Sequence, residues 1–135
     1  LALASNSKNP SHKTAALRGY IGLVRDESLA TKKKLAMCRQ AAALIQRNEE
    51  KKLLLGALAT VPAAEALSMA MAHLDNPATR DEASFAAVAI SEKIVQQSRS
   101  EVAAALQKVI RATDNKDVLR RARATLNKAK KAAGR

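Results

Sequence analysis

Apolar side chains return every three to four residues along most of this 135-residue chain, which is the spacing of amphipathic helices. The pattern predicts seven helices. The first covers 14–24 and carries the stripe Leu17, Ile21 and Val24. The next four are predicted at 31–47, 48–61, 62–74 and 79–97, the sixth opens at Ser98, and the seventh opens at Asn115.

The predicted boundaries rest on residues that stop or start helices. Asn76-Pro77 ends the fourth helix, because proline lacks an N–H and restricts the residue before it. Pro62 suits the first position of that helix. The predicted N-terminal caps are Asn48, Asn115 and two capping boxes, Thr79 with Glu82 and Ser98 with Glu101.

The apolar stripes also recur at regular offsets. The stripe that contains Leu67 recurs 39 residues later at Leu106 and 29 residues earlier at Cys38. A further offset of 37 residues relates Leu54 to Leu17. Spacings of roughly 30 to 45 residues between helical pairs indicate a repeat array, in which each pair buries its stripe only by stacking on its neighbours. The predicted fold is therefore all-α, a short right-handed α-solenoid of about seven antiparallel helices, with a compact helical bundle as the alternative.

Residues 76–90 carry a more specific pattern. Asn76-Pro77 is followed by Thr79-Arg80 and then by alanines at helical spacing. This segment resembles the second-helix signature of HEAT-type repeats, in which Asp-Pro precedes Val-Arg and then Ala and Ala-Leu. Thr79 stands here in place of the usual valine, Leu119 stands where the arginine of the last copy belongs, and the second copy has no proline. The resemblance covers 14–131 and implies a HEAT/ARM-like array.

Three short phrases, at 16–21, 50–56 and 61–67, are also similar to helical modules appended to large, often exported, bacterial proteins. Those proteins include sugar-hydrolase-like proteins of planctomycetes, and the resemblance implies an accessory domain of a larger protein. Residues 1–5 fit either the remnant of a removed signal or the boundary of a longer chain. Exported, periplasmic and cytoplasmic locations all stay open.

The length of the chain predicts a single domain. We expect a flexible lead-in at 1–13, the repeat domain at 14–131 and a frayed tail at 132–135. The sequence contains no apolar run near the ~20 residues that span a bilayer, so no membrane contact is expected.

Thirty alanines predict a core in which helices approach closely, and a single Phe and a single Tyr argue against a sheet. Cys38 lies on an apolar stripe, which predicts a buried thiol, with a reactive or paired thiol as the alternative. Gly19 and Gly56 hold equivalent repeat positions and are predicted to be close-packing points. Phe85 is expected to pack between helices.

The net charge of +12 is concentrated at the two ends of the chain. Residues 1–34 hold seven basic and two acidic residues, 35–115 hold nine of each, and 116–135 hold eight basic residues and one acidic residue. Either these charges solvate terminal repeats, or they attract an anionic partner such as nucleic acid, an acidic glycan or an acidic protein surface. The candidate anion- or partner-binding residues are Arg18, Lys32, Lys33, Lys34, Arg120, Arg121 and Lys128.

No motif in the sequence indicates catalysis or metal binding. His12 and His73 are far apart, the adjacent acid pairs fall at predicted helix ends, and there is no Gly-rich phosphate loop. We therefore expect no enzyme, cofactor, metal or small-molecule substrate. The predicted function is a non-enzymatic protein–protein interaction or scaffolding module that binds a protein or another domain of its own polypeptide. The alternative is nucleic-acid or polyanion binding through the basic terminal helices, less favoured because Tyr20 and Phe85 are the only residues that could stack on bases.

Overall fold

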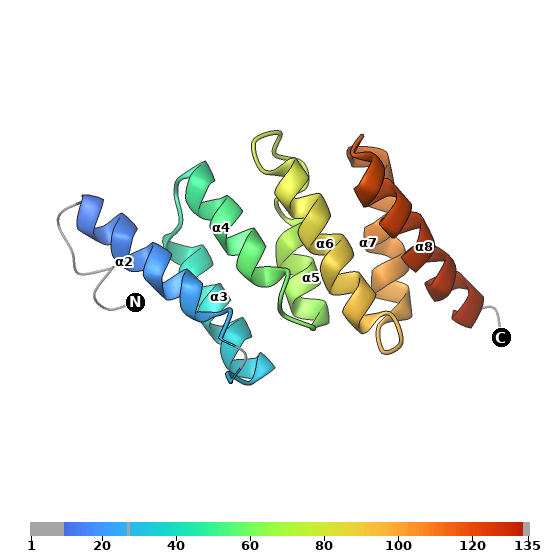
Figure 1. Ribbon diagram of the computed structural model, residues 1–135, viewed down its shortest axis with the longest axis horizontal. Coiled ribbons are helices and arrows are strands. Elements are labelled where there is room, and N and C mark those ends of the chain that lie inside the picture. The colour runs from blue at the N-terminus through green and yellow to red at the C-terminus, as the bar shows by residue number, and fades with distance from the viewer. Residues whose placement is uncertain (1–9, 27, 134–135) are drawn as a thin grey trace.

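The computed structural model describes residues 10–26 and 28–133. Within these ranges the chain forms seven helices and no strand, so the predicted all-α fold is confirmed. In chain order they are α2 (Pro10–Leu23), α3 (Thr31–Leu44), α4 (Asn48–Leu58), α5 (Ala64–Met71), α6 (Arg80–Ile94), α7 (Arg99–Ala112) and α8 (Lys116–Ala133), as Figure 1 shows.

The helix ends differ from the predicted ones by a few residues. α2 begins at Pro10, where the missing N–H of proline is not needed, so the end of the predicted lead-in is helical. The rest of that lead-in, 1–9, lies outside the described residues. α5 is shorter than predicted, because the helix starts two residues after Pro62. α8 runs through 132–133, while the last two residues of the predicted tail lie outside the described part of the chain.

The helices are arranged in two layers (Figure 1). In one layer α2, α4, α6 and α8 lie side by side, each packed on the next. Behind them lie α3, α5 and α7, each packed against the front helices that precede and follow it. In the described chain, every extensive contact joins helices that are one or two positions apart in order. The basic N-terminal and C-terminal helices therefore lie at opposite ends of the molecule.

Helix α6 is the most enclosed element, because α4, α5, α7 and α8 all pack against it. Its buried residues are mostly small: Ala83, Ser84, Ala86, Ala87, Val88, Ile90, Ser91 and Ile94. Small side chains let the four neighbouring helices approach the axis of α6. The short distance between helices fills the space that bulky side chains would otherwise occupy. Only a narrow strip of α6 stays exposed, and it contains Phe85 and Glu92.

Two of the predicted N-terminal caps are asparagines, Asn48 and Asn115. Asn115 caps α8 as predicted, since its Oδ1 accepts hydrogen bonds from the backbone N–H groups of Asp117 at 3.0 Å and Val118 at 3.1 Å. Asn48 is wrong as a cap, because it is the first residue inside α4 and Arg47 precedes it as the cap residue.

The two capping boxes are also wrong, although Thr79 and Ser98 do occupy the cap positions of α6 and α7. Neither side chain bonds to its helix. Thr79 is fully buried, and its hydroxyl donates backwards to the carbonyl of His73 at 2.9 Å. The hydroxyl therefore closes the turn after α5 and does not cap α6.

The sequence also predicted how four single residues pack, and the structure confirms only some of these predictions. Cys38 is fully buried, as predicted. At Gly56 an added Cβ would lie 2.6 Å from the Arg25 guanidinium, so this glycine does allow a close approach, by a side chain from the turn after α2 and not by a helix backbone. Gly19 is wrong as a packing point, because no atom lies within 4 Å of an added Cβ. Phe85 is not packed between helices: it is 47% exposed.

Candidate binding surface at helices α6 and α8

The seven candidate cations separate into two groups at the two ends of the molecule. Arg18 is exposed on α2, and Lys32 and Lys33 are exposed in the first turn of α3. Lys34 differs, because it is only 8% exposed and is a poor candidate for an anion site. The other three candidates, Arg120, Arg121 and Lys128, lie on α8 and line a single hollow.

Lys34 lies near an acidic group of its own chain. The pKa of Asp26 is lowered mainly by hydrogen bonds from the hydroxyl and backbone N–H of Ser28, and to a smaller degree by the charge of Lys34. The first three lysines of α3 therefore do not act as one exposed cluster.

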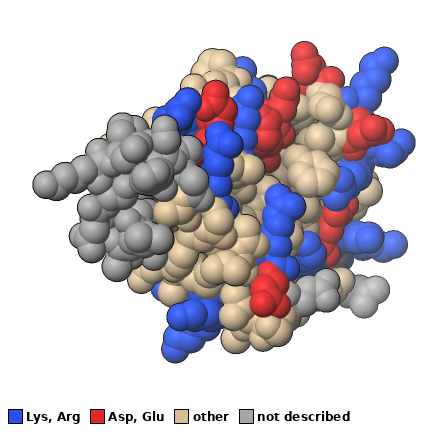
Figure 2. All heavy atoms as spheres, turned by 60° about the vertical axis from the view of Figure 1, so that its left-hand side comes forward, with Lys and Arg blue, Asp and Glu red and all other residues tan. Residues whose placement is uncertain are grey.

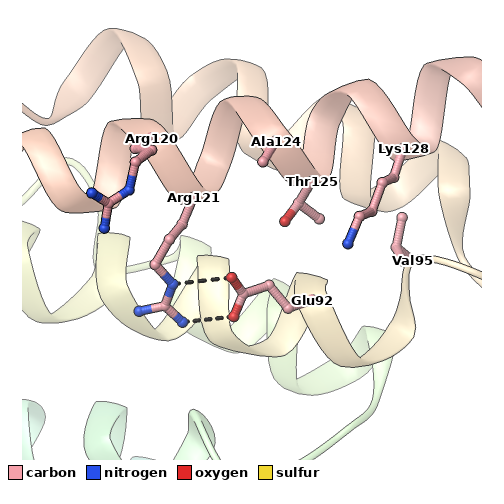
Figure 3. Close-up of a pocket in the computed structure, with 7 residues that line it drawn as sticks. All are labelled: Glu92, Val95, Arg120, Arg121, Ala124, Thr125 and Lys128. Carbon is pink, nitrogen blue, oxygen red and sulfur yellow. Dashed lines mark hydrogen bonds and ion pairs between the residues drawn. The ribbon is translucent and has the colours of Figure 1, made fainter.

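The hollow lies between the last turn of α6 and the middle of α8, and it encloses about 400 Å³ (Figure 3). That volume lies within the usual range of small ligand pockets. Its lining residues are Glu92, Val95, Arg120, Arg121, Ala124, Thr125 and Lys128. Three cations and one carboxylate share a partly apolar recess, so the hollow is suited to an anionic group more than to a cation.

Arg121 connects the two helices of this site. Its Nη2 donates to Glu92 Oε1 at 2.6 Å and its Nε donates to Glu92 Oε2 at 3.0 Å, which forms a two-bonded guanidinium–carboxylate pair (Figure 3). The same guanidinium lies over the Phe85 ring, 5.2 Å from its centroid. The hydrogen bonds from Arg121 lower the pKa of Glu92, and those to Glu92 raise the pKa of Arg121. Both groups are therefore charged at neutral pH.

Arg120 and Lys128 flank this pair. Arg120 contacts Asp117 at 3.2 Å, one turn away on the same helix, but both side chains are more than three-quarters exposed. The charge of Lys128 also lowers the pKa of Glu92, though less than Arg121 does. In Figure 3 the two cations lie on either side of the Arg121–Glu92 pair, with Thr125 and Ala124 between them on α8.

The hollow belongs to a wider face formed by the layer of α4, α6 and α8. Lys52 of α4 lies 3.8 Å from Glu82 of α6, and Lys93 of α6 donates to the carbonyl of Ala59 at 2.8 Å. Leu53 of α4, 39% exposed, adds apolar surface near these contacts. Figure 2 brings the N-terminal side of the molecule forward, and among the described residues it shows acidic side chains between basic ones, with uncharged surface separating several of them. In this view the charge of the described residues is mixed and does not form one uninterrupted basic patch.

Two other groups with shifted pKa values, Cys38 and His73, do not line the hollow. Burial raises the pKa of the Cys38 thiol to about 11, so the buried thiol stays protonated. Burial also lowers the pKa of His73, aided by the charge of Lys51. No cluster of His, Cys, Asp and Glu in the described residues could hold a metal ion. In the same residues, no helix has both the length and the apolar character needed to cross a membrane.

Comparisons with known proteins give no match: no family model, no curated protein and no solved structure matches this chain. The site must therefore be interpreted from its own geometry.

The two residues that contact Arg121, Glu92 and Phe85, were not among the sequence candidates. Glu92 was missed because its partner lies 29 positions away on α8, and no local pattern reports that distance. Phe85 was expected to pack between helices. One signal was available: Phe85 and Glu92 are seven residues apart, so they share one side of a helix whose other sides are lined by apolar and small residues.

Proposed function

We propose that this chain is a HEAT-like α-solenoid module that binds a protein partner, or another domain of its own polypeptide, and catalyses no reaction. The packing supports the solenoid, because extensive contacts join only helices close in order along the described chain. A compact bundle would also pack distant helices around a common core. In this arrangement the pairs are α3–α4, α5–α6 and α7–α8, and the second helix of each pair lies in the layer of α4, α6 and α8.

The observation that carries the proposal is the exposure of Phe85 on that layer. The ring is 47% exposed, while the sides of α6 around it are buried against four helices. Aromatic residues and arginine are enriched in the centres of protein interfaces, where they dominate the binding free energy. Phe85, with the Arg121 guanidinium over its ring, therefore forms an anchor of the kind that such interfaces use.

The test is affinity capture from a lysate of the source cells, with partners quantified by mass spectrometry. We expect the wild-type protein to enrich a specific protein, and Phe85→Glu to reduce that enrichment at least ~10-fold, as for an interface hot spot. Gln107→Glu adds the same charge at an exposed position of α7, on the other layer, and should capture normally. Equal capture by Phe85→Glu and wild type would contradict the proposal, provided that circular dichroism shows both variants to be folded.

A second candidate, polyanion binding, is favoured by the convergence of Arg120, Arg121 and Lys128 on one hollow. Against it, Arg121 is already paired with Glu92, which lies inside the same hollow. Fluorescence anisotropy of labelled duplex DNA at two salt concentrations decides between them. Polyanion binding requires an affinity that falls steeply with salt and that drops when these three residues are changed to Glu.

A further inference from the structure

The hollow between α6 and α8 holds positive charge that its own acidic residue does not neutralise. We propose that it is a docking site for an acidic peptide segment, whose carboxylates contact Arg120 and Lys128 while a neighbouring apolar side chain packs on Phe85. This inference rests on the proposed function, because it names the class of partner segment that the same face binds.

The positive charge of the hollow favours an acidic partner. Glu92 is the one acidic residue in the lining, and both of its oxygens already accept hydrogen bonds from Arg121. Arg120 forms a highly exposed contact with Asp117, and exposed ion pairs of this kind contribute little free energy. Helix α8 as a whole carries seven basic residues and one acidic residue. An incoming carboxylate would therefore meet net attraction at both ends of the hollow.

The spacing of Arg120 and Lys128 along α8 matches the spacing of acidic side chains on an extended peptide. Arg120 and Lys128 are eight residues apart on α8, which corresponds to about 12 Å along a helix. An extended peptide covers roughly 3.3–3.6 Å per residue, so acidic side chains about three to four residues apart would reach both cations. The Arg121–Glu92 pair lies between the two cations and offers no unpaired carboxylate to repel the segment (Figure 3).

Phe85 provides an apolar contact beside the hollow. Helices α6 and α8 run in the same direction (Figure 1), and Phe85 lies two turns before Glu92 on α6. Phe85 is therefore nearer to the Arg120 end of the hollow than to the Lys128 end. Arg121 covers part of the ring, and the 47% that stays exposed can contact an apolar side chain. A peptide that fits this site therefore has its apolar residue next to the acidic residue that contacts Arg120.

The same geometry disfavours a nucleic acid at this site. A phosphate backbone brings closely spaced charges along its whole length. Here Asp81 and Glu82 occupy the first turn of α6 before Phe85, and Asp117 lies before Arg120 on α8. Separate carboxylates on a peptide can avoid these acids, whereas a continuous row of phosphates cannot.

The experiment uses a short fluorescein-labelled peptide that contains one Phe followed by two Glu residues, each pair separated by Gly and Ser. We expect saturable binding by anisotropy, and at least ~10-fold weaker binding for a control peptide with Lys in place of both Glu residues. Lys128→Glu and Arg120→Glu should each weaken binding of the acidic peptide about 10-fold. Lys128→Gln provides a milder variant if charge reversal disturbs α8.

Arg123→Glu is the matched control. It makes the same change in net charge on the same helix, at an exposed position outside the hollow, and should change the affinity less than ~2-fold because the exposed charge is screened. Equal weakening by Arg123→Glu and Lys128→Glu would mean general attraction to a basic helix and would overturn the inference. No binding of the acidic peptide would also overturn it. The inference would likewise be overturned if duplex DNA bound more tightly than the peptide and its affinity fell in Lys128→Glu.

The inference and the proposed function can fail separately. If partner capture depends on Phe85 but is unchanged in Lys128→Glu, the face binds a protein and the acidic-segment inference is wrong. If the peptide binds as expected but no captured protein depends on Phe85, the hollow recognises acidic segments and the broader proposal loses its support. Thermal unfolding of each variant confirms that a loss of binding reflects the site and not the fold.

Discussion

At the N-terminal end of the molecule Lys32 and Lys33 stand exposed in the first turn of α3, whereas at the C-terminal end Arg121 lies against Glu92 and over Phe85 of α6. Both ends of the chain are strongly basic. At the C-terminal end, Arg121 is bonded to another helix, and it lies with Arg120 and Lys128 around one hollow. Net charge therefore says little about where a site lies, and the placement of each cation on its helix says much more.

The helix dipole sharpens this contrast. The first turn of α3 contains three lysines and no acidic residue, so its cations meet the positive end of the helix. Lys130 and Lys131 lie in the last turn of α8, where the negative end of the dipole favours them. The N-terminal lysines oppose their own helix, while the C-terminal ones stabilise theirs.

The largest expected difference between the two regions lies in the core. Ile90 of α6 is fully buried among four helices, so Ile90→Ala should lower the free energy of unfolding by about 3–5 kcal/mol. Leu17 is almost as buried, but α2 is the first of the described helices and makes its extensive contacts with α3 and α4. Leu17→Ala should cost less, about 2–3 kcal/mol, because the end of an array can open locally. Urea denaturation measures both values.

Hydrogen exchange provides the control for that pair. Leu17→Ala should speed amide exchange in α2 and α3 and leave α7 and α8 protected, whereas Ile90→Ala should speed exchange throughout. Equal costs and uniform exchange in both variants would indicate a single cooperative unit, and the distinction between end and centre would be lost.

The second difference is a response to alkaline pH that only the N-terminal half should show. Burial raises the pKa of Cys38 from 9.0 to about 11. Between these values the unfolded thiol loses its proton while the folded thiol keeps it, so stability is full below about pH 9 and falls as pH rises towards 11. The loss should reach about 2–3 kcal/mol. Stability measured from pH 8 to 11 should fall less steeply in Cys38→Ala, and parallel slopes in the two proteins would contradict the assignment.

The third difference concerns two ion pairs that each join different helices. Arg121–Glu92 has two hydrogen bonds and side chains about one-third exposed, whereas Arg39–Glu65 has one contact and side chains about half exposed. Double-mutant cycles to Ala should give a coupling of about 0.5–1 kcal/mol for the first pair and about 0–0.5 kcal/mol for the second. Because Arg121 lowers the pKa of Glu92, the first coupling should be present above the ordinary Glu pKa and fade as pH falls through the lowered value.

Within residues 10–26 and 28–133, the sequence predicted the number, order and type of the helices because each carries a stripe of period 3.6 that must be buried. The prediction that Phe85 packs between helices was wrong. Alanines such as Ala83 and Ala87 are buried instead, since four helices approach α6 so closely that only small side chains fit between them. The large ring therefore lies on the one side of α6 that no helix covers.

The site was partly predictable for a related reason. Arg120, Arg121 and Lys128 share one side of α8 at spacings that any helix would bring together, and the hollow contains all three. Lys34 looked equivalent to Lys32 and Lys33 in the sequence, yet it is buried. Which of three consecutive residues turns inward depends on the rotation of α3 against its neighbours, and a run of identical lysines carries no information about that rotation.

The smallest expected effect tests the dipole contrast directly. Lys33→Glu should stabilise the protein by about 0.3–1 kcal/mol, because it replaces a cation with an anion at the positive end of α3. Lys130→Glu makes the same change at the negative end of α8 and should destabilise by a similar or smaller amount. Thermal unfolding at low ionic strength measures both shifts, and added salt should shrink them.

Opposite signs are the decisive feature of this pair. Each variant lowers the net charge of +12 by two, so relief of general repulsion would stabilise both. Stabilisation by Lys130→Glu as well as by Lys33→Glu would therefore show that total charge outweighs position. A gain at α3 with a loss at α8 would show that the N-terminal lysines weaken their helix while the C-terminal ones support theirs. That outcome would leave the α6–α8 hollow as the end where basic side chains are both favourably placed and available to a partner.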